Sequence, residues 1–308
     1  MQQITNTILM VRPAHFGYDE ETADNNAFQF NDPTLSTKAV EKKAIEEFDQ
    51  FVAKLRAHGV QILVIEDTDT PKKLDAVFPN NWFSTHENGA LVTYPLYAPN
   101  RRAERREDLL ANLAKDFQIN QRINLETFEA DQLYLEGTGS LILDRPNYIA
   151  YACRSVRTDE RLFQYFCERF DFEPFLFHAE DDLGQPIYHT NVMMALGDTF
   201  VVIALETIQN TFERNKLVKQ FAKTGKDIIE ISLEQMKSFA GNMLQVCNTK
   251  GDRFLVMSSQ AYKSLSSEQL KQIEQHCPII HSPLDTLETY GGGSARCMMA
   301  EIFLPQLV

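Results

Sequence analysis

VMMALGDTFVVIALETIQNTFERNKLVKQFAKTGKDIIEI, residues 192–231, contains the pattern from which the fold can be inferred. It begins with two short apolar runs, 192–195 and 200–204, separated by a Gly-Asp corner, and such runs are typical of β-strands. Residues 210–224 then have the spacing of an amphipathic helix, and 227–231 is another run of branched residues. The order strand, strand, helix, strand therefore defines one structural unit.

The same order recurs about five times along the chain, at roughly 50 to 60 residues per unit. Other strand-like runs and amphipathic segments have the expected order: strands at 8–11, 61–65, 90–93, 141–143, 174–177, 243–246, 253–257 and 278–280, and helices at 37–58, 105–116, 158–170 and 266–276. Repeats of this length favour a radial architecture. We predict an α/β fold with pseudo-fivefold ββαβ repeats in a single domain, residues 1–308; an ordinary α/β or α+β sheet protein is the alternative.

The composition limits the classes of partner. The 308 residues are 44% hydrophobic, which is ample for a core, and the net charge of −13 argues against a nucleic-acid surface. One basic cluster, RRAERRED at 101–108, carries its own acids and is expected to be the solvated start of a helix. No stretch approaches the length of a membrane span, so we expect no nucleic-acid partner and no membrane partner.

Five cysteines are present, an odd number without paired short spacings. This pattern indicates neither a disulfide framework nor a zinc site. The N-terminus is too polar for a secretory signal. A reducing cytoplasm is therefore the expected location.

The stretch GGGSARC, residues 291–297, suggests chemistry at its last residue. Successive glycines allow the backbone to approach a ligand closely, and Cys297 follows them at once. His189 in YHTN (188–191) and Glu136 in LEGTG (135–139) each stand between a polar segment and an apolar run. A thiol, an imidazole and a carboxylate together can form a base-oriented nucleophile. Burial of Cys297 as a packing residue beside the apolar run 298–300 is the alternative.

These candidates occupy similar places in the repeat. Asn80 and Asn81, Glu136, His189 and Asn242 each precede the first strand of a unit, and Cys297 ends the final unit. Because the inner ends of radially arranged units converge on one axis, we expect these residues to meet there.

Seven motifs, in order along nearly the whole chain, resemble those of the guanidino-group-modifying superfamily, the pentein fold. This superfamily includes arginine deiminases, dimethylarginine hydrolases, succinylarginine dihydrolase and amidinotransferases. Within it, the chain looks most like the amidinotransferase-like citrulline-utilization hydrolases. The motifs are MVRP (10–13), FPNNWF (78–83), LEGTGS (135–140), SVRT (155–158), YHTN (188–191), GNM (241–243) and GGGSARC (291–297).

The resemblance implies a five-bladed α/β propeller with a central reactive site that needs no metal or organic cofactor. It further implies that Cys297 is the nucleophile, that His189 is the general acid and base, and that Glu136 orients this histidine.

The resemblance also implies substrate-binding residues. Arg157 matches an arginine that holds the substrate's α-carboxylate, with a surface arginine at a helix start as the alternative. Asn80, Asn81 and Trp82 match residues that hold the group being cleaved, although packing alone would also explain an aromatic side chain there.

Asn191 bears on the choice of substrate. Deiminases of this superfamily typically carry a carboxylate two residues after the histidine, and here that position is an amide. Asparagine can both donate to and accept from a neutral ureido group, whereas a buried guanidinium needs anionic partners. The sequence therefore predicts hydrolysis of citrulline to ornithine, carbon dioxide and ammonia, unless another acid, such as Asp32 or Glu87, folds into the cleft.

Other functions stay open at this point. An arginine deiminase or dimethylarginine-type hydrolase would use the same catalytic residues on a cationic substrate, and an amidinotransferase would pass the group to an amine. A non-catalytic binding protein is the alternative from another class, because a ribosome anti-association factor shares the fold. The expected partner is a small amino-acid substrate, and a homo-oligomer is compatible with the sequence. Residues 19–33 are either a lid or a surface loop, and their polar character favours the loop.

Overall fold

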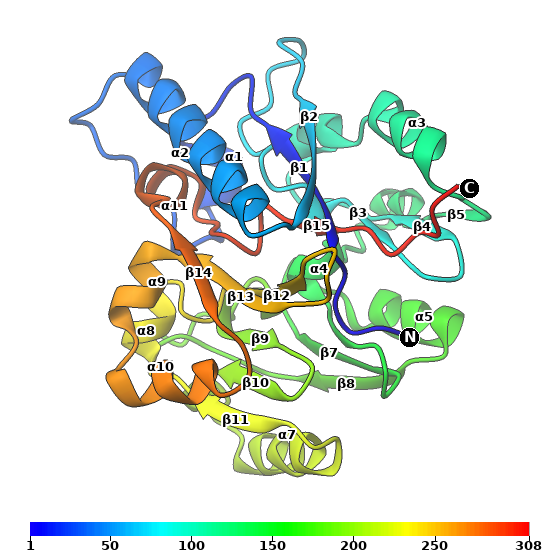
Figure 1. Ribbon diagram of the computed structural model, residues 1–308, viewed down its shortest axis with the longest axis vertical. Helices are drawn as coiled ribbons and strands as arrows, with labels where there is room; N and C mark the ends of the chain where they lie inside the picture. Colours follow the sequence, from blue (N-terminus) through cyan, green and yellow to red (C-terminus); the bar gives the residue numbers. More distant parts are fainter. Residues whose placement is uncertain (308) are drawn as a thin grey trace.

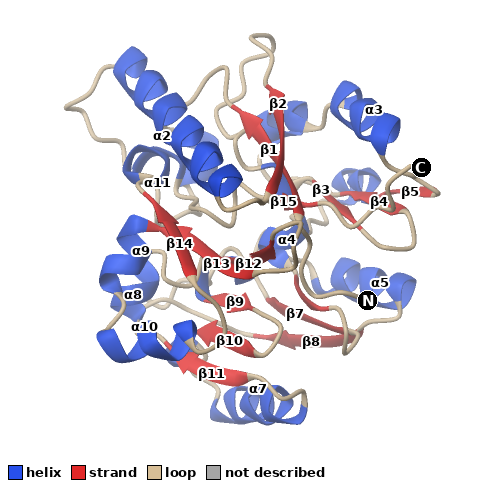
Figure 2. Ribbon diagram, viewed as in Figure 1, coloured by secondary structure: helices blue, strands red, loops and turns tan. Residues whose placement is uncertain are grey.

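The structure is a computed structural model that describes residues 1–307. These residues form five three-stranded sheets and a set of connecting helices. The strands gather around the middle of the molecule, and the longer helices lie on its outside (Figure 1, Figure 2).

All five sheets are built in the same way. The first strand pairs antiparallel with the middle strand, and the middle strand pairs parallel with the last. The sheets, in this order of strands, are β15 (Ala300–Glu301), β1 (Thr7–Arg12) and β2 (Gln61–Glu66); β3 (Phe83–Thr85), β4 (Ala90–Thr93) and β5 (Gln121–Asn124); β6 (Ile142–Asp144), β7 (Ile149–Cys153) and β8 (Glu173–Phe177); β9 (Met194–Leu196), β10 (Phe200–Ile203) and β11 (Asp227–Glu230); and β12 (Leu244–Cys247), β13 (Arg253–Ser258) and β14 (Ile279–Ser282).

Each parallel pair is joined by a helical crossover, because parallel neighbours cannot be connected by a tight turn. The crossover helices are α2 (Thr37–Ala57), α3 (Glu107–Asp116), α5 (Glu160–Phe170), α7 (Thr211–Lys223) and, together, α9 (Ser259–Ser264) and α10 (Ser267–Glu274). The remaining helices are α1 (Glu20–Ala23), α4 (Gly137–Ser140), α6 (Thr190–Met193), α8 (Leu233–Lys237) and α11 (Asp285–Gly291), with 3-10 segments η1 (Pro79–Asn81), η2 (Pro99–Glu104), η3 (Leu125–Asp131) and η4 (Leu205–Thr207). None of the described helices is both long enough and apolar enough to cross a bilayer.

Helix α2 illustrates why these segments form. Ser36 caps its start by accepting a hydrogen bond from the backbone N–H of Ala39, and Gly59, with φ of +81°, follows its end. One face packs into the core, with buried residues every three or four positions: Val40, Ala44, Phe48, Phe51, Val52 and Leu55. Burial of this face holds α2 on the outside of its sheet.

The predicted fold class is confirmed, with two differences in detail. Residues 192–193, expected in a strand, belong to helix α6. Strands β3, β5, β7 and β15 were not predicted; β5 is polar and largely exposed, and β15 has two residues, so neither carries an alternating apolar pattern. Because β15 pairs with β1, the two ends of the chain share one sheet.

The first strand of each sheet follows a short helix or turn, and this repeated feature positions the site. Asn80 lies in η1 before β3, Glu136 precedes α4 and β6, and His189 precedes α6 and β9. Asn242 stands in the turn before β12, and Cys297 in the turn before β15.

Candidate active site

A buried pair of side chains, Glu136 and His189, forms one part of the candidate site. His189 Nε2 lies 2.8 Å from Glu136 Oε2, and both residues are almost completely buried. The other carboxylate oxygen, Oε1, accepts a hydrogen bond from the backbone N–H of Tyr97 at 2.8 Å. Glu136 therefore fixes the orientation of the imidazole ring.

The surroundings set the charge of both groups. Burial alone raises the pKa of Glu136, but the charge of Arg157, the hydrogen bond from His189 and the charge of Arg101 outweigh burial and lower the net pKa. Burial lowers the pKa of His189 to about 4, although Glu136 acts in the opposite direction. His189 is thus a neutral imidazole at neutral pH, with its proton on Nε2 and a free lone pair on Nδ1.

Gly139 keeps space open beside His189 Nδ1. A Cβ atom on Gly139 would lie 2.8 Å from His189 Nδ1 and 2.6 Å from Asn81 Nδ2, and real Cβ atoms do not approach so closely. Gly137, with φ of +49°, is equally constrained, because a Cβ there would collide with the carbonyl oxygen of Asn80. The glycines of this motif therefore let Asn81 and His189 come together.

Cys297 is held by two side-chain amides. Its Sγ atom lies 3.3 Å from Nδ2 of Asn242 and 3.6 Å from Nδ2 of Asn191, and the residue is 4% exposed. Amide N–H groups aimed at sulfur offer donors for the negative charge of a thiolate. The glycine run allows this close packing, because a Cβ on Gly293 would lie 2.8 Å from the ring of Phe78.

The segment around His189 contacts the loop of Cys297 at two points. Tyr188 donates from its hydroxyl to the carbonyl oxygen of Gly292 at 2.8 Å, and Asn191 donates to Cys297 Sγ. The histidine stands between these two contacts. The imidazole and the thiol therefore belong to one small buried region, although no hydrogen bond joins them directly among the described residues.

Several polar atoms in this region have no hydrogen-bond partner within residues 1–307, the part of the chain that the structure describes. They are Oδ1 and Nδ2 of Asn80, Nδ2 of Asn81, Oδ1 of Asn191 and Oδ1 of Asp75. Buried polar atoms are nearly always paired in folded proteins, since each unpaired group costs about 1–3 kcal/mol. The arrangement suits a polar ligand that supplies both donors and acceptors.

Sequence reasoning missed a charged cluster next to Asn81. Arg101 donates to Asn81 Oδ1 at 3.0 Å, pairs with both carboxylate oxygens of Glu104 at 2.8 Å, and lies 3.7 Å from Asp75. The prediction that this stretch is solvated was wrong for Arg101 and Glu104, which are each 3% exposed. Basic and acidic residues that alternate along a sequence are compatible with a solvated helix start and equally with a buried ion-pair network. Arg101 and Glu104 form such a network in η2.

Asp75 is a fully buried acid beside this cluster. Burial raises the pKa of Asp75 to about 7; the charge of Arg101 opposes this effect, and the charges of Glu104 and Asp19 add to it. Asp19 is also buried and accepts from Asn100 Nδ2 through both carboxylate oxygens at 2.8 Å. The two acids named from the sequence lie elsewhere: Asp32 accepts from Thr34, and Glu87 accepts from Gln2.

Arg157 lies under the segment 19–33. Its Nε donates to Asn25 Oδ1 at 2.7 Å, its Nη2 donates to the carbonyl oxygen of Thr22 at 3.1 Å, and its Nη1 lies 3.5 Å from Glu136 Oε2. The guanidinium is buried over the ring of Tyr188. Its assignment to a substrate carboxylate stays a prediction, and in this structure the segment 19–33 uses two of its donors.

The segment 19–33 packs against the site while several of its residues stay exposed, so the choice between a lid and a surface loop stays a prediction. Besides its contacts with Arg157, it reaches the glycine run: Asn26 Nδ2 donates to the carbonyl oxygen of Gly292 at 3.4 Å, and Gln29 Nε2 donates to that of Tyr290 at 3.1 Å. Phe30 also donates from its backbone N–H to the carbonyl oxygen of Thr289 at 2.7 Å. The polar side chains that suggested solvent exposure are instead used as hydrogen-bonding groups.

Trp82 is not brought to this site. Its ring packs against Phe83, with 4.6 Å between the ring centroids, and belongs to a hydrophobic cluster that includes Leu91 and Leu109. Packing therefore accounts for the tryptophan, as the alternative interpretation held.

Comparison with known proteins agrees with the fold. The family model described as eukaryotic N,N dimethylarginine dimethylhydrolase matches residues 12–304. ArgZ, an arginine dihydrolase from the ornithine-ammonia cycle in cyanobacteria, is similar in its apo structure: 17% identity, TM-score 0.75, 98% of this chain and 41% of that chain. The chain thus spans about two fifths of the length of that protein. No curated protein sequence is significantly similar to the chain.

Two further structures match over their whole length. The product-bound N-terminal domain of ArgZ has 18% identity and a TM-score of 0.73, covering 99% of this chain and 100% of that chain. A variant of dimethylarginine dimethylaminohydrolase, in an adduct with S-methyl-L-thiocitrulline, has 15% identity and a TM-score of 0.65, covering 97% of this chain and 99% of that chain.

The predicted superfamily is confirmed by these matches, whereas the narrower citrulline-utilization group is not tested by them. At such low identities the solved structures establish the fold, and the family model supplies the relationship. Because that model spans nearly the whole chain, the protein belongs to the N,N-dimethylarginine dimethylhydrolase family of the guanidino-group-modifying, or pentein, superfamily.

Proposed function

We propose that the protein is a cysteine hydrolase that cleaves a terminal C–N bond in a free amino acid carrying a guanidino or ureido group. The observation that carries this proposal is the double contact between the His189 segment and the Cys297 loop, through Tyr188 and Asn191. A thiol, a neutral imidazole and its orienting carboxylate from Glu136 are the parts that covalent acyl-type hydrolysis needs.

In the proposed reaction, Cys297 loses its proton to His189 Nδ1, and its sulfur attacks the terminal carbon of the substrate. His189 then gives this proton to the terminal nitrogen, the C–N bond breaks, and ammonia leaves. A water molecule then transfers a proton to His189 and attacks the carbon of the remaining thioester-like adduct. The C–S bond breaks, and His189 returns the proton to the sulfur of Cys297. With citrulline as substrate, the product is a carbamate that loses carbon dioxide to leave ornithine.

The direct test is to measure ammonia and ornithine released from citrulline and from arginine by the purified protein, side by side. Hydrolysis of either substrate supports the proposal. Release that depends on an added amine acceptor would instead identify an amidinotransferase, and binding without turnover of any guanidino or ureido compound would identify a non-catalytic protein.

Citrulline is our first choice of substrate because of the amides. Asn80, Asn81 and Asn191 have unpaired donors or acceptors in the buried site. A neutral ureido group has one carbonyl acceptor and several N–H donors, so it complements side-chain amides without adding a charge.

A cytoplasmic location and a homo-oligomeric state also stay predictions from the sequence.

Arginine is the second candidate, and Asp75 is the observation that favours it. The charges of Arg101 and Arg157 already have the partners Glu104 and Glu136. Asp75 lies 3.7 Å from Arg101 through Oδ2, and its Oδ1 has no hydrogen-bond partner among the described residues. This surplus acid weakens the inference that the site is poor in anions, and an ionised Asp75 would accept a guanidinium. The similarity to ArgZ, an arginine dihydrolase, and to a dimethylarginine dimethylaminohydrolase supports the same candidate, because both names indicate a guanidino substrate.

The KM values of arginine and citrulline should depend differently on pH, because the pKa of Asp75 is about 7. Below that pH the carboxyl is protonated and neutral, and above it the carboxylate is negative. If arginine is the substrate, its KM should fall about tenfold between about pH 6 and about pH 8, whereas the KM of citrulline should stay constant. Steady-state kinetics with both substrates measure this difference.

Asp75→Asn should abolish that pH dependence, because the amide carries no charge at either pH. Asp116→Asn, at an exposed acid, is the matched control and should keep it. An arginine KM that is flat with pH in the wild type, or that changes equally in Asp75→Asn, would remove Asp75 from substrate recognition.

Gly139→Ala should reduce kcat/KM by at least about tenfold, because the added methyl group enters the space between His189 Nδ1 and Asn81 Nδ2. Gly17→Ala is the control, since its Cβ would meet nothing closer than 3.9 Å and its φ is ordinary. Equal activity of both variants would show that the space beside Nδ1 is not used by the substrate.

A further inference from the structure

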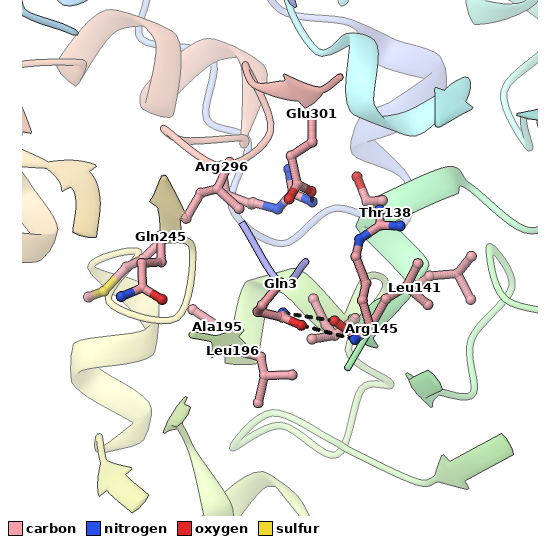
Figure 3. Close-up of a pocket in the computed structure, with 13 residues that line it drawn as sticks. Gln3, Thr138, Leu141, Arg145, Ala195, Leu196, Gln245, Arg296 and Glu301 are labelled. Carbon is pink, nitrogen blue, oxygen red and sulfur yellow. Dashed lines mark hydrogen bonds and ion pairs between the residues drawn. The ribbon is translucent and has the colours of Figure 1, made fainter. Parts of the chain in front are cut away.

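A small cavity, separate from the candidate active site, lies between the first strands of four sheets. It has a volume of about 30 Å³, and β6, β9, β12 and β15 each contribute lining residues. Gln3 lines it from the N-terminal segment, and Thr138 from α4. In Figure 3 the side chains of Arg145 and Arg296 reach into this cavity, Arg296 alongside Glu301.

Arg145 is a buried arginine without an ion-pair partner. It is 3% exposed, and among residues 1–307 no carboxylate forms a salt bridge with it. Its guanidinium makes one hydrogen bond there, from Nη1 to Nδ1 of His86 at 3.4 Å, and stacks on the ring of Phe303 at 3.9 Å. Most of its five donors are therefore unused by the protein, although a buried guanidinium stays charged and needs partners.

The neighbouring charges do not neutralise Arg145. Glu301 is engaged by Arg296, whose Nη2 lies 2.8 Å from Glu301 Oε2 and whose Nη1 donates to the carbonyl oxygen of Met299. Burial lowers the pKa of Arg145, and Glu301 and Glu87 raise it only from beyond ion-pair distance. Burial also lowers the pKa of His86, so this ring is a neutral acceptor. The groups that line the cavity thus leave an excess positive charge.

From this geometry we propose that this cavity binds one small monovalent anion, such as chloride, on the free guanidinium donors of Arg145. The volume admits only one or two water-sized particles, so nucleotides and dicarboxylates do not fit. Gln3 fixes the site, because its Oε1 accepts from the backbone N–H of Arg145 at 2.9 Å and its Nε2 donates to the carbonyl oxygen of Leu143 at 2.9 Å.

The anion would stabilise the segments that carry the candidate catalytic groups. Arg296 directly precedes Cys297, and Thr138 follows Glu136 by two residues in the same short segment. An anion between the first strands of the sheets would neutralise the buried charge where these segments converge. This role is separate from the proposed hydrolysis, so the site can be tested without knowing the substrate.

The experiment is thermal unfolding of the full chain at constant ionic strength, with chloride replacing gluconate, which is too large for the cavity. The wild type should show a saturating rise in Tm of about 2–4 °C. Arg145→Met removes the buried charge, keeps apolar contact with Phe303, and should show no rise. Arg122→Gln, at an exposed arginine paired with Glu107, is the matched control and should keep the full rise.

A Tm that does not respond to chloride in the wild type, or that responds equally in Arg145→Met, would overturn the proposal. If Arg145→Met does not fold, crystals of the wild type grown in sodium bromide give an independent result. An anomalous bromide peak within hydrogen-bonding distance of the Arg145 guanidinium supports the site, and its absence from the cavity overturns it.

Discussion

Replacing Cys297 with alanine should lower the rate of ammonia release by at least about 10³-fold, because it removes the sulfur that attacks the substrate in the proposed mechanism. The side chain is small and the two amides that hold it remain, so the fold should persist. Steady-state rates measure the loss of activity, and an unchanged Tm shows that the loss comes from the missing sulfur and not from unfolding.

Cys247→Ala is the matched control, because this cysteine is also free but lies at the end of β12 away from the glycine run. It should keep wild-type activity. Retained turnover in Cys297→Ala, or an equal loss in Cys247→Ala, would contradict the assignment of the nucleophile.

Glu136→Gln should have the second largest effect, on both activity and stability. Without the carboxylate, the tautomer and orientation of His189 are no longer fixed, and kcat should fall by about 10²- to 10⁴-fold. The charge of Arg157 also loses its buried partner, which should cost about 3–5 kcal/mol of unfolding free energy. Denaturant unfolding and kinetics measure the two effects separately.

The pH dependence of stability distinguishes this effect from a general loss of packing. The pKa of Glu136 is lowered in the folded protein, so its contribution is complete above the ordinary carboxyl pKa of 4.5 and is lost as pH falls below that value. The variant should lack this loss. Glu160→Gln, at an exposed pair with Arg154, should change stability by less than about 1 kcal/mol and leave kcat unchanged.

The repeated units could be predicted because the middle strands and the crossover helices are strongly patterned. The run 200–204 and the helical spacing of 210–224 each correspond to an element, β10 and α7. Strand β15 could not be predicted in this way, since two residues carry no periodicity. Residues 300–301 form a strand because they pair with β1 at the opposite end of the chain. No local sequence pattern encodes such a contact.

Cys297 could be singled out because it follows the glycine run and because its motif resembles that of the superfamily. Glu136 and His189 in addition follow one rule, a polar segment immediately before the first strand of a sheet. Asp75 and Arg101 do not follow it. Arg101 lies in a stretch of alternating charges that has the pattern of a solvated helix start, and it becomes buried only because Asn81 and Asp75 approach it in space. A signal was present in the spacing of Arg101 and Glu104, which are three residues apart and pair within η2.

The contacts of residues 19–33 with the site could not be predicted, for a related reason. Polar composition in residues 19–33 favoured a surface loop, but Asn25, Asn26 and Gln29 use their amides to bind Arg157 and the glycine run. Sequence composition shows that such side chains need hydrogen bonds; it does not show whether water or the protein supplies them.

The central claim, that Cys297 attacks the substrate covalently, is tested most directly by mass spectrometry of protein quenched with acid during turnover. We predict that the peptide containing Cys297 gains the mass of citrulline less ammonia, or of arginine less ammonia if that is the substrate. Product accumulation with an unmodified Cys297 peptide, or with the adduct on a different cysteine, would contradict the account.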